Sequence, residues 1–222
     1  MKDLKTTMNR GLQPRQLRLE VWSNVIWYGY YYGTGSIERL EKEYGIQVKW
    51  RAFPLHPDTP DQGLSLEELF ARKGIFSDVD KIVTQLQATA AKFNLPMGNR
   101  KMTYNSRLAQ EVGLWAETKG KGHDFHMAAF RAYFVAGDNL AKREVLLDLI
   151  RSVGLDPGEG EAVIEQRTFK DAVDADWELS RTKRITAVPT FFMGLDRLVG
   201  AQPHEVLEKM VIKHRGEIHP KN

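Results

Sequence analysis

The chain has 222 residues, of which 42% are hydrophobic and 27% charged, and its formal net charge is +3. This length is enough to bury a substantial core in one domain, or in one domain that carries an insertion. The small charge does not indicate a nucleic-acid partner, and no stretch reaches the ~18 apolar residues of a membrane span. The first 20 residues also lack the apolar core of a secretory signal. We therefore expect a cytoplasmic protein without nucleic-acid or membrane partners, and leave its oligomeric state open.

The chain contains no cysteine. Disulfides, thiolate metal sites and thiol nucleophiles are therefore excluded for this sequence. How much this absence means depends on which residues occupy the positions where cysteine would be expected.

Two strands and a helix are predicted near the start of the chain. Apolar and polar residues alternate over 17–22 and again over 46–51, with the period of two that is typical of strands. Between these segments Ile37, Leu40 and Tyr44 share one face of a predicted helix. Strand, helix and strand at this spacing predict a βαβ unit with parallel strands.

The patterns then become helical almost throughout residues 65–184. Ser65 with Glu68 forms a capping box ahead of the first of these helices. Strand patterns return at 187–193 and 197–199, and a closing helix carries Pro203 in its first turn. The predicted order is βαβ, a helical block, then ββα.

This order predicts one α/β domain that is interrupted by a helical insertion. We place the α/β domain at residues 15–62 and 186–216, and the insertion at 63–185. Residues 1–14 are predicted to be a flexible N-terminal arm, and residues 217–222 a C-terminal tail.

Several short segments, in their order along the chain, resemble motifs of the DsbA-like oxidoreductases. The run Val188-Pro189-Thr190 before a strand and Gly200–Pro203 ahead of the last helix resemble motifs of the family. The segments that resemble its FrnE-like subgroup are Trp50–Pro57 after the second strand, Tyr104–Ala109 and Phe130–Phe134. The resemblance implies a thioredoxin fold (βαβ then ββα) with a large all-helical insertion. It also implies that Val188-Pro189 is a cis-proline loop whose residue before proline faces the active site.

The segment 23–33 aligns without a gap with the active-site motif of that subgroup, Ser-Asp-x-x-Cys-Pro-Trp-Cys-Tyr-x-Gly. The two agree at Ser23, Tyr31 and Gly33. Family members exchange disulfides through the two cysteines of this motif, so the resemblance implies the family of thiol:disulfide oxidoreductases.

The two cysteines themselves are replaced. Trp27 and Tyr30 stand at their positions, and Tyr28 and Gly29 lie between them. Disulfide exchange needs an attacking thiolate and a resolving thiol, and neither an indole nor a phenol supplies one. We therefore expect a redox-inactive member of the family, with these four residues as candidates for any remaining site.

We expect such a member to bind a peptide or a small molecule in the old active-site cleft, with Val188, Pro189, His56 and Tyr31 as binding residues. The aromatic rings around Trp27 are either a stacking platform for a ligand or simply packing. No metal site is expected, because a third ligand near the histidine pair at 123 and 126 is not identifiable. No resident cofactor is expected either.

Two alternatives stay open. In the branch that resembles kappa-class glutathione transferases and 2-hydroxychromene-2-carboxylate isomerases, a serine at the first cysteine position binds the thiolate of glutathione. Here the hydroxyl of Tyr28, Tyr30 or Tyr31 would have to replace it, with glutathione as the cofactor. In the other alternative, the natural sequence carries Cys-Pro-Trp-Cys at 27–30 and differs from the present one.

Overall fold

The computed structural model describes residues 17–31, 33–76 and 78–218 of the chain. The predicted arm at 1–14 and the last four residues of the predicted tail lie outside these ranges. Within the described ranges, no helix is both long enough and apolar enough to cross a membrane. The cytoplasmic location stays a prediction.

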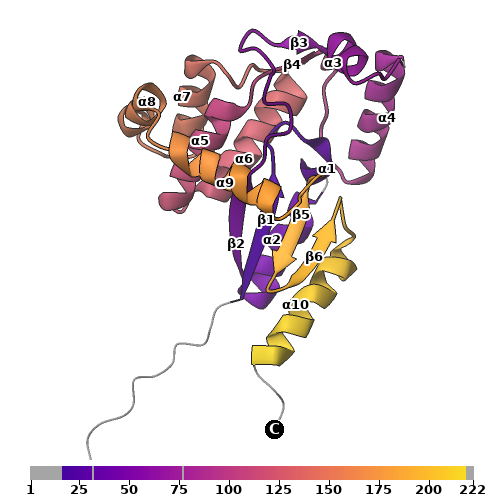
Figure 1. Ribbon diagram of the computed structural model, residues 1–222, viewed down its shortest axis with the longest axis vertical. Helices are drawn as coiled ribbons and strands as arrows, with labels where there is room; N and C mark the ends of the chain where they lie inside the picture. The colour runs from indigo at the N-terminus through magenta and orange to yellow at the C-terminus, as the bar shows by residue number, and fades with distance from the viewer. Residues whose placement is uncertain (1–16, 32, 77, 219–222) are drawn as a thin grey trace, which may run out of the picture.

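A mixed four-stranded sheet forms the centre of the α/β part (Figure 1). Its strands, in the spatial order β2-β1-β5-β6, are β1 (Arg18–Ser23), β2 (Gln47–Ala52), β5 (Thr190–Met193) and β6 (Asp196–Val199). β1 runs parallel to β2, while β5 is antiparallel to both β1 and β6. Val21 pairs with Trp50 on one side and with Phe191 on the other. This topology confirms the predicted βαβ–ββα arrangement.

Three helices belong to this α/β part: α1 (Tyr28–Tyr31), α2 (Thr34–Tyr44) and α10 (His204–Ile218). α2 buries Ile37 and Leu40, as the sequence predicts, and ends at Gly45, whose φ of 63° suits a residue without a side chain. α10 packs near α2, where the hydroxyl of Tyr44 donates a hydrogen bond of 2.8 Å to Oε1 of Glu208.

The insertion is mainly helical, as predicted, and lies at one end of the sheet (Figure 1). Its elements are α3 (Leu66–Arg72), α4 (Val79–Lys92), α5 (Arg107–Thr118), α6 (Gly122–Arg131), the π-helix η1 (Ala132–Ala136), α7 (Arg143–Ser152), α8 (Pro157–Gln166) and α9 (Lys170–Thr182). The predicted capping box is present: the Ser65 hydroxyl accepts from the Glu68 amide, and Oε2 of Glu68 accepts from the Ser65 amide, both at 3.0 Å.

The insertion also contains two short strands that the sequence does not predict. β3 (Leu64–Ser65) pairs antiparallel with β4 (Met102–Thr103). Each has two residues, so neither shows the alternation from which a strand is predicted.

The insertion shares its hydrophobic core with the sheet. One continuous cluster joins Leu19 and Val21 of β1 to Phe125 and Phe130 of α6, and all four side chains are fully buried. Burying each of them contributes roughly 1.5–3 kcal/mol. The helices are therefore fixed to the sheet by the same apolar contacts that stabilise the sheet itself.

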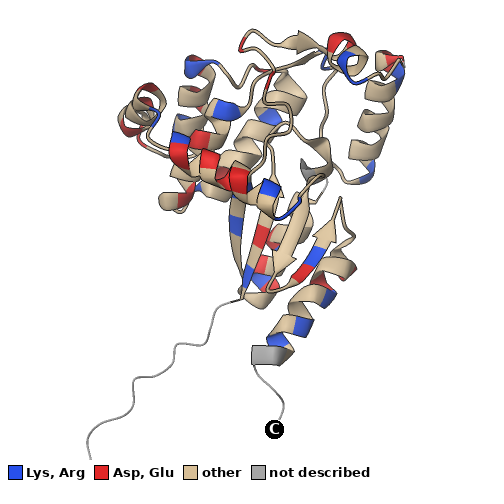
Figure 2. Ribbon diagram, in the orientation of Figure 1, with Lys and Arg blue, Asp and Glu red and all other residues tan. Residues whose placement is uncertain are grey.

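A buried ion pair also fixes α9 to β2. Nη1 of Arg51 on β2 lies 2.7 Å from Oδ1 of Asp176, and the second oxygen of Asp176 accepts a 3.0 Å hydrogen bond from the Ala52 amide. Asp176 is 4% exposed. Figure 2 shows the acidic residues that gather along α9. Among them, Asp176 contacts β2, whereas the side chain of Asp174 is 47% exposed.

Asp176→Ala is expected to destabilise the fold by about 3–5 kcal/mol, because it leaves the Arg51 guanidinium partly buried without one of its two carboxylates. Urea unfolding measures the effect. Asp174→Ala is the control, since it removes an exposed carboxylate that pairs with Arg107 and is expected to cost at most about 1 kcal/mol. Equal losses from the two substitutions would contradict this role for Asp176.

Candidate functional site

A tight turn leads from the end of β1 into α1, and Asn24 holds it. The Oδ1 of Asn24 accepts from the Ile26 amide at 3.1 Å, and its Nδ2 donates to the Phe53 carbonyl at 2.7 Å. The Asn24 carbonyl also accepts from the Trp27 amide at 2.9 Å. Asn24 is 2% exposed, so these bonds are shielded from water. They place Trp27 immediately before the first residue of α1.

The indole of Trp27 lies directly over Gly29. A Cβ atom on Gly29 would come within 2.7 Å of Nε1 of Trp27. The Trp27 ring also packs on the Tyr28 ring, with 4.5 Å between centroids. Among the described residues, the Trp27 Nε1 has no hydrogen-bond partner and is sealed from solvent. The close backbone approach that Gly29 permits is thus used by the Trp27 side chain.

The cis-proline loop lies beside this indole. The Val188–Pro189 peptide bond is cis, as the resemblance implies. Val188 is buried in a small apolar cluster with Trp22 and Phe53, and Trp27 packs against that cluster. The structure therefore brings together the two segments that sequence comparison placed at one site.

A cavity of about 230 Å³ opens on the other side of Trp27 and Tyr28. We name it the α1 cavity. Its walls are mostly apolar side chains from α1, α3 and α4, including Leu69 and Val83. Its polar lining comes from His56, Lys73, Arg100, Thr103 and Tyr133. Val188 and Pro189 are not among the residues that line it.

Arg100 is the central polar residue of this lining. Its Nη1 donates to the Tyr133 hydroxyl at 2.8 Å and to the carbonyl of Met102. Its guanidinium carbon lies 4.4 Å from the centre of the Tyr133 ring. The Tyr133 hydroxyl in turn donates to the Thr103 hydroxyl at 2.9 Å. Within the described part of the chain, Arg100 forms no ion pair.

His56 lines the cavity, and its Nδ1 lies 3.3 Å from Nζ of Lys73. Its role in binding stays a prediction. Burial, together with the nearby charge of Lys73, lowers the pKa of His56 to about 4. His56 is consequently neutral at pH 7 and is suited to hydrogen bonding. Burial also lowers the pKa of Lys73.

Of the three candidate tyrosines, Tyr28 lines the cavity, and burial raises its pKa, so its hydroxyl stays protonated at neutral pH. The side chains of Tyr30 and Tyr31 lie outside what the structure describes, and their predicted roles stay predictions.

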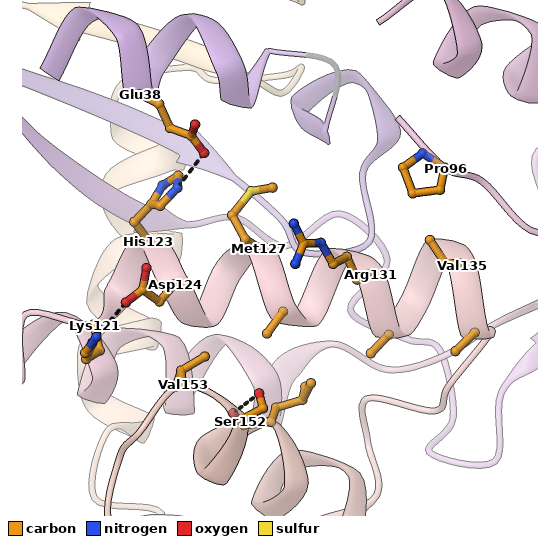
Figure 3. Close-up of a pocket in the computed structure, with 14 residues that line it drawn as sticks. Glu38, Pro96, Lys121, His123, Asp124, Met127, Arg131, Val135, Ser152 and Val153 are labelled. Carbon is orange, nitrogen blue, oxygen red and sulfur yellow. Dashed lines mark hydrogen bonds and ion pairs between the residues drawn. The ribbon is translucent and has the colours of Figure 1, made fainter. Parts of the chain in front are cut away.

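A second, more open hollow of about 880 Å³ lies along α6, between α2 and α7 (Figure 3). Its charged groups largely pair with one another: His123 lies 3.0 Å from Glu38, and Lys121 lies 2.8 Å from Asp124. His126 stacks on Trp50 at 5.0 Å between centroids, and the His123 ring lies 6.5 Å from the same Trp50 ring. Trp27 does not line this hollow.

Comparison with known proteins agrees with this geometry. The DSBA-like thioredoxin domain family matches residues 30–211, most of the chain. The chain belongs to the DSBA-like thioredoxin domain family. The FrnE-like subgroup stays a prediction within that family.

Three individual proteins show the range of similarity within and around the DSBA-like family. The Bacillus subtilis (strain 168) protein YwbO is 26% identical over 196 residues, which cover 88% of this chain and 96% of YwbO. A probable DsbA oxidoreductase from Streptomyces coelicolor is 25% identical with a TM-score of 0.82, and the match covers 93% of each chain. A 2-hydroxychromene-2-carboxylate isomerase shares the fold, with a TM-score of 0.67 at 14% identity over 90% of this chain and 97% of its own.

Four further residues of the site are not predicted from the sequence: Asn24, Lys73, Arg100 and Tyr133. Asn24 stands at the aspartate position of the subgroup motif, so the alignment contained a signal for it. Arg100 lies in a loop without periodicity just ahead of β4, and nothing in its neighbourhood predicts that it lines a cavity.

Gly29→Ala is expected to destabilise the DSBA-like domain by about 1 kcal/mol or more, because the new methyl group must displace the Trp27 ring. Thermal unfolding is the measurement. Gly35→Ala in α2 is the control: nothing lies within 4 Å of its Cβ position, and the better helix propensity of alanine is expected to stabilise by about 0.5–1 kcal/mol. An increase in Tm for both variants would show that the ring does not occupy this space.

His56 is expected to titrate with a midpoint near 4 in NMR spectra of the folded protein, with His56→Asn identifying its signals. Its folded-state pKa lies below the ordinary 6.5, so its contribution to stability is complete above pH 6.5 and is lost as the pH falls from 6.5 towards 4. Lys73→Gln is expected to raise the midpoint only part of the way, because burial is the larger cause. A midpoint near 6.5 in the unmodified protein would contradict the burial of this ring.

Proposed function

We propose that this chain is a redox-inactive member of the DSBA-like family that binds a small molecule in the α1 cavity. The observation that carries the proposal is the position of Trp27. The residue stands where the attacking cysteine of the family would stand, and its ring closes the approach to the start of α1 while forming one wall of the cavity. The fold is kept, and the dithiol chemistry has no nucleophile.

A small molecule suits the site better than a peptide. The α1 cavity is a compact space of about 230 Å³ with apolar walls and a few convergent polar groups, which is the general character of small-ligand sites. An extended peptide would pair with the backbone of Val188 at the cis-proline loop, and neither Val188 nor Pro189 lines the α1 cavity.

A second candidate function is a glutathione-dependent isomerase or transferase, and the placement of Tyr28 favours it. Tyr28 lines the cavity, and burial raises its pKa, so its phenol stays protonated at neutral pH. A protonated phenol is a group that can donate a hydrogen bond to a thiolate. Calorimetry with glutathione separates the two candidates. Binding that Tyr28→Phe weakens would support the second, and the absence of heat and of any thermal shift would dismiss it.

The unmodified protein is expected to show no catalysis of insulin reduction by dithiothreitol, because it has no thiol. The double variant Trp27→Cys with Tyr30→Cys places two thiols at the start of α1, three residues apart, and is expected to gain measurable turnover. Trp27→Ser with Tyr30→Ser is the control that removes both rings without adding sulfur. Catalytic turnover by the unmodified protein would overturn the proposal.

Occupation of the cavity is tested with 4-phenyl-1-butanol, a neutral apolar probe, in a titration followed by tryptophan fluorescence. We expect saturable binding that changes the emission of Trp27, because this ring forms part of the wall. Val83→Phe fills the cavity from α4 and is expected to weaken binding at least tenfold. Unchanged affinity in this variant would place the probe elsewhere on the protein.

A further inference from the structure

We propose that the natural ligand of the α1 cavity is an amphipathic carboxylate, with its acidic group bound by Arg100 and its apolar part against the walls from α3 and α4. The inference rests on the proposed function, since it names the chemical class of the molecule that the cavity binds.

The charged groups around the α1 cavity favour a negatively charged ligand. The charged side chains that line it, Lys73 and Arg100, are both basic, and no aspartate or glutamate is among its described lining residues. The charges of Lys73 and Arg100 both lower the pKa of His56, which is neutral at pH 7. Lys73 is exposed, whereas Arg100 is partly buried, so Arg100 is the cation on which the proposal rests.

The described partners of Arg100 are all neutral groups. Its described contacts are a hydroxyl, a backbone carbonyl and two aromatic rings, those of Tyr133 and Phe134. Arg51, another partly buried guanidinium beside an aromatic ring, has two carboxylate partners, Glu20 and Asp176. A partly buried guanidinium without a counter-charge is electrostatically incomplete, and a ligand that brings one negative charge would complete it.

One edge of the Arg100 guanidinium makes no hydrogen bond in the described part of the chain. Both hydrogen bonds of its side chain use Nη1. Nε and Nη2 make none in the described part of the chain, and neither atom is sealed from solvent. These two N–H groups point from the same edge of the guanidinium plane, which is the edge that binds both oxygens of a carboxylate.

The rest of the ligand is defined by the walls. Leu69 and Val83 are buried apolar residues that face the cavity, and the rings of Trp27 and Tyr28 close its other side. A body of one ring or a short chain matches such walls, whereas a highly polar metabolite would lose its hydration without gaining hydrogen bonds. The combination of one anionic group and an apolar body is what the cavity can satisfy completely.

The test compares 4-phenylbutyrate with 4-phenyl-1-butanol, which have the same apolar body and differ in charge. Calorimetry at pH 7.5 is expected to show at least tenfold tighter binding of the carboxylate. Arg100→Gln is expected to remove this preference and to leave the affinity for the alcohol unchanged. Lys101→Gln is the matched control: it removes the same charge from the adjacent, exposed residue and is expected to keep the preference.

Arg100→Lys is the second variant. It keeps a positive charge beside the Tyr133 ring and is less disruptive to folding than Arg100→Gln. It is expected to weaken carboxylate binding several-fold through loss of the two-point contact, and to leave the alcohol unaffected. Equal affinity of the unmodified protein for both probes would overturn this inference while leaving the proposed function intact. Carboxylate binding that neither Arg100 variant changes would also overturn it. Absence of binding by both probes would reject the proposed function itself.

Discussion

The packing of the Trp27 ring at the start of α1 is the contact on which the rest of the site depends. The ring lies against Gly29 of α1, against the apolar cluster that holds Val188, and along one wall of the α1 cavity. Asn24 fixes the turn that puts it there. A ring in this position gives the start of α1 and the cis-proline loop a shared apolar contact.

The cavity exists because the insertion and the α/β part meet at this point. α1 belongs to the α/β part, whereas α3, α4 and η1 belong to the insertion, and each contributes side chains to the walls. The common core that joins β1 to α6 and the ion pair between Arg51 and Asp176 hold these two parts together. The shape of the cavity therefore depends on contacts some distance from it. A substitution at the contact between α9 and β2 affects how the two parts that form the cavity walls are held together.

Charge is distributed unevenly between the outer face and the cavity. The acidic residues of α9 lie on the surface or pair with arginines, as Asp174 and Asp176 do (Figure 2). The α1 cavity contains only basic charges among its described lining residues. With a net charge of only +3, the whole chain gives no hint of this local field. Local arrangement, rather than composition, makes the cavity attractive to an anion.

The sequence by itself determined the fold and the loss of dithiol chemistry. Both rest on local patterns: the period-two strands, the capping box at Ser65, and the ungapped alignment that puts Trp27 and Tyr30 at the cysteine positions. The α1 cavity and its lining, in contrast, are seen only in the tertiary structure. Arg100, Lys73 and Tyr133 come from a loop, a helix end and a π-helix, and only folding brings them to one cavity. The position of these residues at one cavity cannot be predicted from a periodic sequence pattern. It depends on long-range packing between segments rather than on the residues next to each one.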